Sequence, residues 1–186
     1  MLYTKNGDDG KTTIFGCNQR LSKSSAVAEA LGVLDEVNSY LGIIKGTILS
    51  NNKIQNVDPV SVSSDLVHQI QENLFIIQAE IAGAPKNIGE EKVKELETLI
   101  AKIEKEIPPI KFFIISGATE MSAMFDFART LARRAERRVV EVKEEGLVKI
   151  GDETLAYLNR LSSTLFAMSR QSAHESGINE SNPNYR

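Results

Sequence analysis

Five stretches of this 186-residue chain carry apolar residues at steps of three and four, the spacing that lines one face of a helix. The sequence contains neither an internal repeat nor strands that alternate with helices. It therefore predicts an all-α fold, a five-helix bundle in an up-and-down, ferritin-like arrangement. The first expected helix begins near residue 25 and ends at a polar loop at residues 50–64. The other four are expected at residues 65–82, 90–106, 120–145 and 152–175.

Polar segments flank the expected bundle. Residues 1–23 are rich in Gly, Asp, Thr and Asn and predict an irregular segment or a short hairpin. The bundle is expected at residues 24–176, with a short apolar link at residues 112–118, and the polar tail at residues 177–186 is expected to be loose. A chain of this length suits one domain, so residues 1–186 are interpreted as a single unit.

The composition excludes several classes of protein. A net charge of −3 argues against a protein that coats nucleic acid by bulk attraction. No apolar run approaches the roughly 18 residues that a membrane span needs, and the polar N-terminus does not resemble a signal peptide. Cys17 is the single cysteine, which rules out an internal disulfide and suits a reducing cytoplasm. The expected protein is cytoplasmic and binds neither nucleic acid nor membrane.

Arginines are concentrated in the motif ARTLARRAERR, which holds five of the nine arginines of the chain between Arg129 and Arg138. Arg129, Arg133 and Arg137 are four residues apart and are expected on one face of a helix. Guanidinium groups suit phosphate and carboxylate partners, so the cluster indicates a phosphate site. A solvated basic face with salt bridges to other helices explains the same pattern equally well.

Two further polar positions stand beside apolar stripes. Asp35 lies in an otherwise apolar helix, where a carboxylate needs a partner such as arginine. Asn159 lies at the border of the stripe in the last helix and suits either a helix-to-helix hydrogen bond or the polar edge of a ligand.

Conventional catalytic groups are sparse. A di-iron bundle needs Glu-x-x-His twice, and the two histidines, His68 and His174, do not complete that pattern. Cys17 has no histidine near it in sequence. The motif GDDGKT at residues 7–12 has two residues between its glycines instead of the four of a phosphate-binding loop, and no buried strand precedes it. It predicts either a plain turn or a different kind of phosphate contact.

Five segments, in chain order, resemble the PduO-type ATP:cob(I)alamin adenosyltransferases: TKNGDDGKTTIFG, RLSK, EALGVLDEVNSYLG, ARTLARRAERRVV and YLNRLSSTLF. The resemblance covers the chain from Tyr3 to about Arg170. It implies a homotrimer with active sites between subunits. It also implies transfer of the 5′-deoxyadenosyl group from ATP to cob(I)alamin, formed from cob(II)alamin, with release of triphosphate. A flavin-dependent reductase and an adenosylcobalamin-dependent enzyme are the partners that it implies.

The resemblance also implies roles for individual residues. Phe113 matches the aromatic residue at the lower face of the corrin, where it displaces the axial base. Asp35 is expected to pair with Arg129 across the subunit boundary. Mg²⁺ is expected to bridge the ATP phosphates, with no protein ligand assigned to it. The residues that match the ATP site are Thr4, Lys5, Asn6, Gly7, Thr12, Thr13, Lys23, Arg133, Arg134, Glu136, Arg137 and Asn159.

Two places differ from the family pattern, and both are expected on the corrinoid side. Asp126 stands where the family usually has histidine, and Ser116-Gly117-Ala118 stands where it often has Pro-Gly-Gly. Two other functions stay open. One is a helical nucleic-acid-binding module that uses the arginine cluster. The other, motivated by Asp126, is an adenine-nucleotide sensor or corrinoid carrier that has lost activity.

Overall fold

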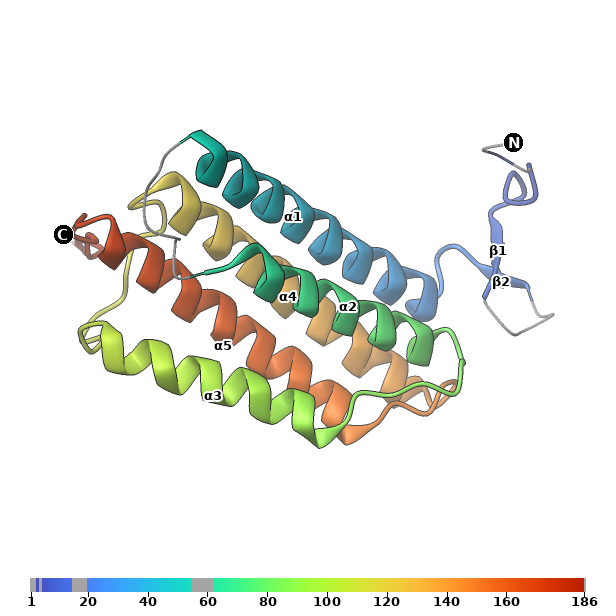
Figure 1. The fold of residues 1–186 in the computed structure, drawn as a ribbon. Coiled ribbons are helices and arrows are strands. Elements are labelled where there is room, and N and C mark those ends of the chain that lie inside the picture. Colours follow the sequence, from blue (N-terminus) through green and yellow to red (C-terminus); the bar gives the residue numbers. More distant parts are fainter. Residues whose placement is uncertain (1–2, 4, 15–19, 55–61, 186) are drawn as a thin grey trace.

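The computed structural model describes residues 3, 5–14, 20–54 and 62–185 of the chain. Five helices pack side by side with successive helices running in opposite directions, and a small hairpin stands beside the start of the first helix (Figure 1). The predicted five-helix fold is confirmed. None of the described helices has the length and apolarity that crossing a membrane requires. The elements are β1 (Lys11–Thr13), β2 (Arg20–Ser22), α1 (Ala26–Ile54), α2 (Ser64–Ile81), α3 (Glu90–Glu106), α4 (Glu120–Glu145) and α5 (Asp152–Glu175).

The first helix is longer than its sequence pattern predicts. α1 continues to Ile54, through the polar stretch that begins at Ser50. The expectation of a loop from residue 50 is therefore wrong for these residues. No proline or glycine interrupts the stretch, and Ser50 and Asn51 are exposed, so their polar side chains stay in water while the backbone remains helical. Loss of apolar periodicity marks where burial ends, which here precedes the end of the helix.

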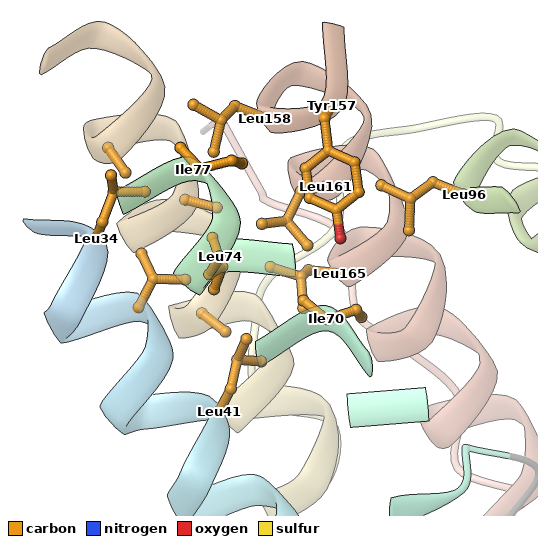
Figure 2. Packing of buried hydrophobic residues seen from close by; sticks show 14 of the residues in the cluster. Leu34, Leu41, Ile70, Leu74, Ile77, Leu96, Tyr157, Leu158, Leu161 and Leu165 are labelled. Carbon is orange, nitrogen blue, oxygen red and sulfur yellow. The ribbon is translucent and has the colours of Figure 1, made fainter. Parts of the chain in front are cut away.

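The apolar stripes of the helices meet in one core (Figure 2). α4 packs against both α1 and α5, α2 packs against α1, and α3 packs against α5. Burial of one large aliphatic side chain contributes roughly 1.5–3 kcal/mol, so this shared core holds α4 and α5 in place. Its buried side chains include Leu34, Leu41, Ile70, Leu74, Ile77, Leu158, Leu161 and Leu165.

Local signals set both ends of α4. At its start, the Thr119 hydroxyl accepts a hydrogen bond from the Ser122 N–H (3.0 Å), and the Ser122 hydroxyl accepts one from the Thr119 N–H (2.8 Å). At its end, Gly146 adopts a φ of 69°, a left-handed conformation that favours glycine. These ends match the predicted helix at residues 120–145. The packing of the apolar face of α4 against α1 and α5 sets how the arginine cluster is rotated about the helix axis.

Glu80, at the end of α2, is a buried carboxylate that binds the start of α5. The residue is 6% exposed, and it accepts hydrogen bonds from the Gly151 N–H (2.8 Å) and the Thr154 hydroxyl. Gly151 has no side chain with which to cap the helix itself. Replacing Glu80 with alanine is expected to lower the free energy of unfolding by about 2–3 kcal/mol, because two interior donors lose their acceptor.

Urea unfolding followed by circular dichroism measures this effect. Glu72→Ala, at an exposed position of the same helix, is the matched control. Equal losses of stability in the two variants would contradict the capping role of Glu80.

The C-terminal segment packs against the bundle. The Ile115 N–H donates to the Ser181 carbonyl oxygen (2.9 Å). Arg170 of α5 forms an ion pair with Glu180, and the two side chains are only 12% and 13% exposed. The expectation of a loose tail is therefore wrong for the described residues 177–185. Polar composition predicted looseness, but a largely enclosed ion pair to a helix holds this segment in place.

Candidate functional site

A pocket of about 910 Å³ lies where the link before α4, the helices α4 and α5, and the C-terminal segment meet. Three residues that the sequence assigns to the site, Phe113, Arg129 and Arg133, line it together. Mainly apolar walls with a few charged groups suit a large ligand with polar edges. The other lining residues are Ile110, Lys111, Phe112, Ile114, Ser162, Ser163, Phe166, Asn182, Pro183 and Tyr185.

Exposed aromatic side chains distinguish one wall of this pocket. Phe113 is 80% exposed, and Phe112 and Tyr185 are exposed as well. Phenylalanine side chains in water forgo the free energy of burial, so a group of them indicates a surface that another molecule covers. Flat aromatic rings suit a flat apolar ligand.

Arg129 is the most enclosed of the clustered arginines. Its guanidinium carbon lies 5.8 Å from the centre of the Phe166 ring, a cation–π contact. Its Nε atom is buried without a hydrogen-bond partner, and the Oδ1 atom of Asp126 lies 3.7 Å away. Asp126 is itself buried. Among the described residues, Arg129 and the expected partner Asp35 form no ion pair with each other, and Asp35 is exposed.

The structure divides the arginine cluster between two faces of α4. Arg129 and Arg133 line the pocket, whereas Arg134 and Arg137 line a groove of about 580 Å³ between α1 and α4. A step of four residues overshoots one helical turn by about 40°, so two steps rotate Arg137 well away from Arg129. The expectation that Arg129, Arg133 and Arg137 share one face is therefore too simple. The groove is completed by Glu36, Ser39, Tyr40, Ile43, Phe127, Thr130 and Leu131.

The arginines also differ in their partners. Arg134 forms an ion pair with Glu36 of α1, and Arg138 forms ion pairs with Glu141 (2.8 Å) and with Glu29 of α1 (3.6 Å). Salt bridges to another helix thus account for these two. Within the described part of the chain, Arg133 and Arg137 form no ion pair, and both are exposed. They are the members of the cluster that are free to bind an external anion.

Asn159 connects α5 to α4. Its Nδ2 atom donates to Glu136 Oε1 (3.0 Å), and its Oδ1 atom accepts from Arg160 (2.8 Å). The helix-to-helix hydrogen bond that the sequence allowed is therefore present. Asn159 is exposed and Glu136 is half-buried, so both side chains remain accessible to a ligand.

The N-terminal candidates gather around a tight turn and the hairpin that follows it. Lys5, Asn6 and Gly7 lie in the turn, where the Asp8 N–H donates to the Lys5 carbonyl oxygen (3.2 Å). A strand and not a helix follows, so GDDGKT is not the usual phosphate-binding loop, as its spacing predicted. Lys23 donates from Nζ to the Gly7 carbonyl oxygen (2.9 Å). Thr12 and Thr13 lie on β1, and Thr4 lies outside the described residues.

Within one chain, the N-terminal candidates and the residues that line the pocket lie apart. The hairpin stands at one end of the bundle, whereas the C-terminus and the link at residues 107–119, which border the pocket, lie at the other end (Figure 1). Any site that uses both groups requires a second copy of the chain. This arrangement agrees with the expectation of a site between subunits and does not test it.

Some lining residues were missed by sequence reasoning. Phe166 stands seven residues after Asn159 on α5, so helical periodicity would have placed both on neighbouring parts of one face. Asn182, Pro183 and Tyr185 carried no such signal, because only the contacts of the C-terminal segment bring them to the pocket.

Comparisons with known proteins agree on one family. A family model described as cobalamin adenosyltransferase matches residues 2–172. The corrinoid adenosyltransferase PduO of Salmonella typhimurium is 36% identical over 187 residues, which cover 95% of this chain and 52% of that protein. The chain thus spans about half the length of that relative. The corrinoid adenosyltransferase of Bacillus subtilis is 34% identical, with 96% of this chain and 90% of that protein covered.

Solved structures give the same result. A variant of the PduO-type ATP:corrinoid adenosyltransferase from Lactobacillus reuteri, complexed with cobalamin and ATP, superposes with a TM-score of 0.86 at 29% identity, covering 100% of this chain and 97% of that one. Another variant of the Lactobacillus reuteri enzyme, complexed with ATP, gives a TM-score of 0.84 at 30% identity, covering 98% of this chain and 100% of that one.

Proposed function

The chain belongs to the cobalamin adenosyltransferase family, and from this premise we propose that it transfers the 5′-deoxyadenosyl group of ATP to the Co(I) centre of a reduced corrinoid. One observation carries the proposal beyond family membership. The exposed aromatic wall at Phe113 and the unpaired guanidinium of Arg133 line the same pocket, so an apolar macrocycle and an anionic nucleotide can be held side by side. The structure of a Lactobacillus reuteri relative complexed with cobalamin and ATP supports the proposal of these two ligands.

In the proposed reaction the Co(I) electron pair attacks the ribose C5′ carbon. A Co–C bond forms, the C5′–O bond breaks, and triphosphate leaves with the electron pair of that bond. The protein therefore needs no nucleophile of its own, which accords with the absence of a histidine near Cys17 in the sequence. Lys23, Arg133 and Arg137 neutralise the charge that develops on the triphosphate, and Phe113 covers the lower face of the corrin.

Mg²⁺ is proposed to enter with the nucleotide. Among the residues that the structure describes, no three His, Cys, Asp or Glu side chains gather in a way that could hold a metal ion. Phosphate oxygens supply the hard ligands that Mg²⁺ prefers, and this ion usually keeps several waters when it binds. The ion would screen the charge of the triphosphate against Asp8, which is exposed in the turn.

We also propose a homotrimer that builds each site from two neighbouring chains. The hairpin and the C-terminus lie at opposite ends of the bundle within one chain (Figure 1), and Arg133 lines the pocket that the C-terminal segment borders, so the N-terminal turn of one copy would reach Arg133 of the next. Ile43 and Phe127 are exposed on the outer faces of α1 and α4, where they border the groove that holds Arg134 and Arg137. Apolar side chains beside a charged groove suit a contact between subunits. A flavin-dependent reductase and an adenosylcobalamin-dependent enzyme remain predicted partners.

The activity is tested by mixing the protein, ATP and cob(I)alamin under anaerobic reduction. The expected result is adenosylcobalamin, followed by its absorbance, with one triphosphate released for each product molecule. ATP binding without product would instead indicate the nucleotide sensor or corrinoid carrier. Salt-dependent DNA binding tighter than ATP binding would favour the nucleic-acid module.

Asp35→Asn tests the pairing with Arg129 across the proposed subunit boundary. Asparagine keeps a neutral acceptor, so the expected cost is about 1 kcal/mol, or about fivefold in activity or in trimer association. Sedimentation velocity and the adenosylation rate measure the two effects. Glu104→Gln, which removes a charge from an exposed position of α3, is the control. An intact trimer with full activity in Asp35→Asn would contradict the pairing.

A further inference from the structure

Arg20 of β2 holds the N-terminal turn at three points. Its Nη1 and Nη2 atoms donate to the two carboxylate oxygens of Asp9, each at 2.9 Å. Nη2 also lies within hydrogen-bond reach of the carbonyl oxygens of Asn6 and Lys11, the latter at 3.4 Å. A planar guanidinium is well suited to such a fork, because its N–H groups have fixed directions. One side chain thus connects both ends of the turn.

Asp9 serves this arrangement as an ionised carboxylate. Its Oδ1 atom accepts a hydrogen bond from the Lys11 N–H (3.1 Å) in addition to those from Arg20. The hydrogen bond from the Lys11 N–H is the largest cause that holds the pKa of the Asp9 carboxyl below its usual value; desolvation opposes it, and the hydrogen bond and charge of Arg20 lower the pKa further. Because both of its oxygens are engaged, Asp9 is not free to bind a cation, and its negative charge is balanced by Arg20.

The backbone that Arg20 holds is one that the chain would not adopt readily. Lys5 has a φ of 62°, a left-handed conformation that is uncommon for residues other than glycine. The carbonyl group of the next residue, Asn6, accepts from Arg20, and that of Gly7 accepts from Lys23 Nζ (2.9 Å). A Cβ atom on Gly7 would lie 2.9 Å from the same Nζ atom. Two cations therefore hold consecutive carbonyl groups and set the course of the turn.

We propose that Arg20 is a positioning residue for the nucleotide. With Asp9 it holds residues 5–10 in the conformation that receives the triphosphate, and it does not itself bind a phosphate group. The inference rests on the proposed function, since it assumes that this turn covers ATP. Its consequence is specific: the Arg20–Asp9 pair lowers the cost of ordering the turn on binding, which affects the affinity for ATP and not that for the corrinoid.

A charge swap tests the proposal. Arg20→Asp and Asp9→Arg are each expected to raise the Kd for ATP by about tenfold, and the double variant is expected to recover to within about threefold of the parent protein. The KM for cob(I)alamin and the kcat at saturating ATP should not change. Thermal unfolding should not change either, because Arg20 and Asp9 are exposed and neither belongs to the hydrophobic core. Lys11→Gln, which removes a neighbouring exposed cation, is the control for lost charge alone.

Two outcomes would overturn the proposal. If the double variant binds ATP as weakly as Arg20→Asp does, Arg20 binds phosphate directly. If Lys11→Gln weakens binding as much as Arg20→Asp, general charge and not positioning is responsible. Calorimetry with ATP alone measures the Kd of each swap variant even if the protein forms no adenosylcobalamin. A failure of the proposed activity is therefore distinguishable from a failure of the positioning role.

Discussion

Replacing Arg133 with alanine is expected to weaken ATP binding by about 10- to 150-fold, or about 1.5–3 kcal/mol, the range for one hydrogen bond to a charged group. Arg133 lines the pocket, is exposed, and forms no ion pair with any residue that the structure describes. Its guanidinium is thus available to a phosphate without first breaking another contact. Isothermal titration calorimetry with ATP, in the absence of corrinoid, measures the change.

Arg138→Ala is the matched control for this experiment. Arg138 belongs to the same cluster and the same helix, but it is engaged by Glu141 and Glu29 and does not line the pocket. Its replacement removes the same charge and should change the Kd for ATP by less than about threefold. Unchanged ATP affinity in Arg133→Ala would count against the proposed nucleotide site.

Replacing Phe113 with alanine is expected to lower the rate of adenosylation by about 30-fold or more while the affinity for ATP stays the same. The side chain is 80% exposed at the pocket wall, so a bound corrin ring would cover it. Loss of a central aromatic contact typically costs at least about 2 kcal/mol. Anaerobic assays at a series of cob(I)alamin concentrations separate the effect on kcat from that on KM.

Phe75→Ala controls for the removal of an exposed aromatic side chain. Phe75 is 61% exposed on α2, and it does not line the pocket. An adenosylation rate in Phe113→Ala as high as that in Phe75→Ala would mean that the aromatic wall plays no part in the reaction.

The helices were predictable because their signals are local. Apolar residues spaced three and four positions apart mark each helix, and Thr119 and Gly146 mark the two ends of α4. Each of these signals acts within a few residues of the chain. The predicted bounds of α4 at residues 120–145 therefore agree with the structure. The end of α1 was not predictable in the same way, because the helix continues to Ile54 through a polar stretch in which Ser50 and Asn51 are exposed.

The candidate site was only partly predictable, for a related reason. The sequence pointed to Arg133 and Phe113 through motifs, and the structure places both on one pocket. The sequence did not distinguish Arg133 from Arg134. Only Arg134 has an ion-pair partner among the described residues, and that partner, Glu36, lies on α1, far away in the chain.

Amino-acid order alone thus determined the five helices, their directions and the residues that carry charge. Tertiary structure decided which of those charges are already neutralised. It paired Arg134 with Glu36, Arg170 with Glu180 and Arg20 with Asp9, and it left Arg133 without an ion pair among the described residues. Helix formation depends on neighbours within a turn or two, whereas the partner of a charge is set by whichever element packs against it. The site is therefore defined by what the folded chain leaves unpaired.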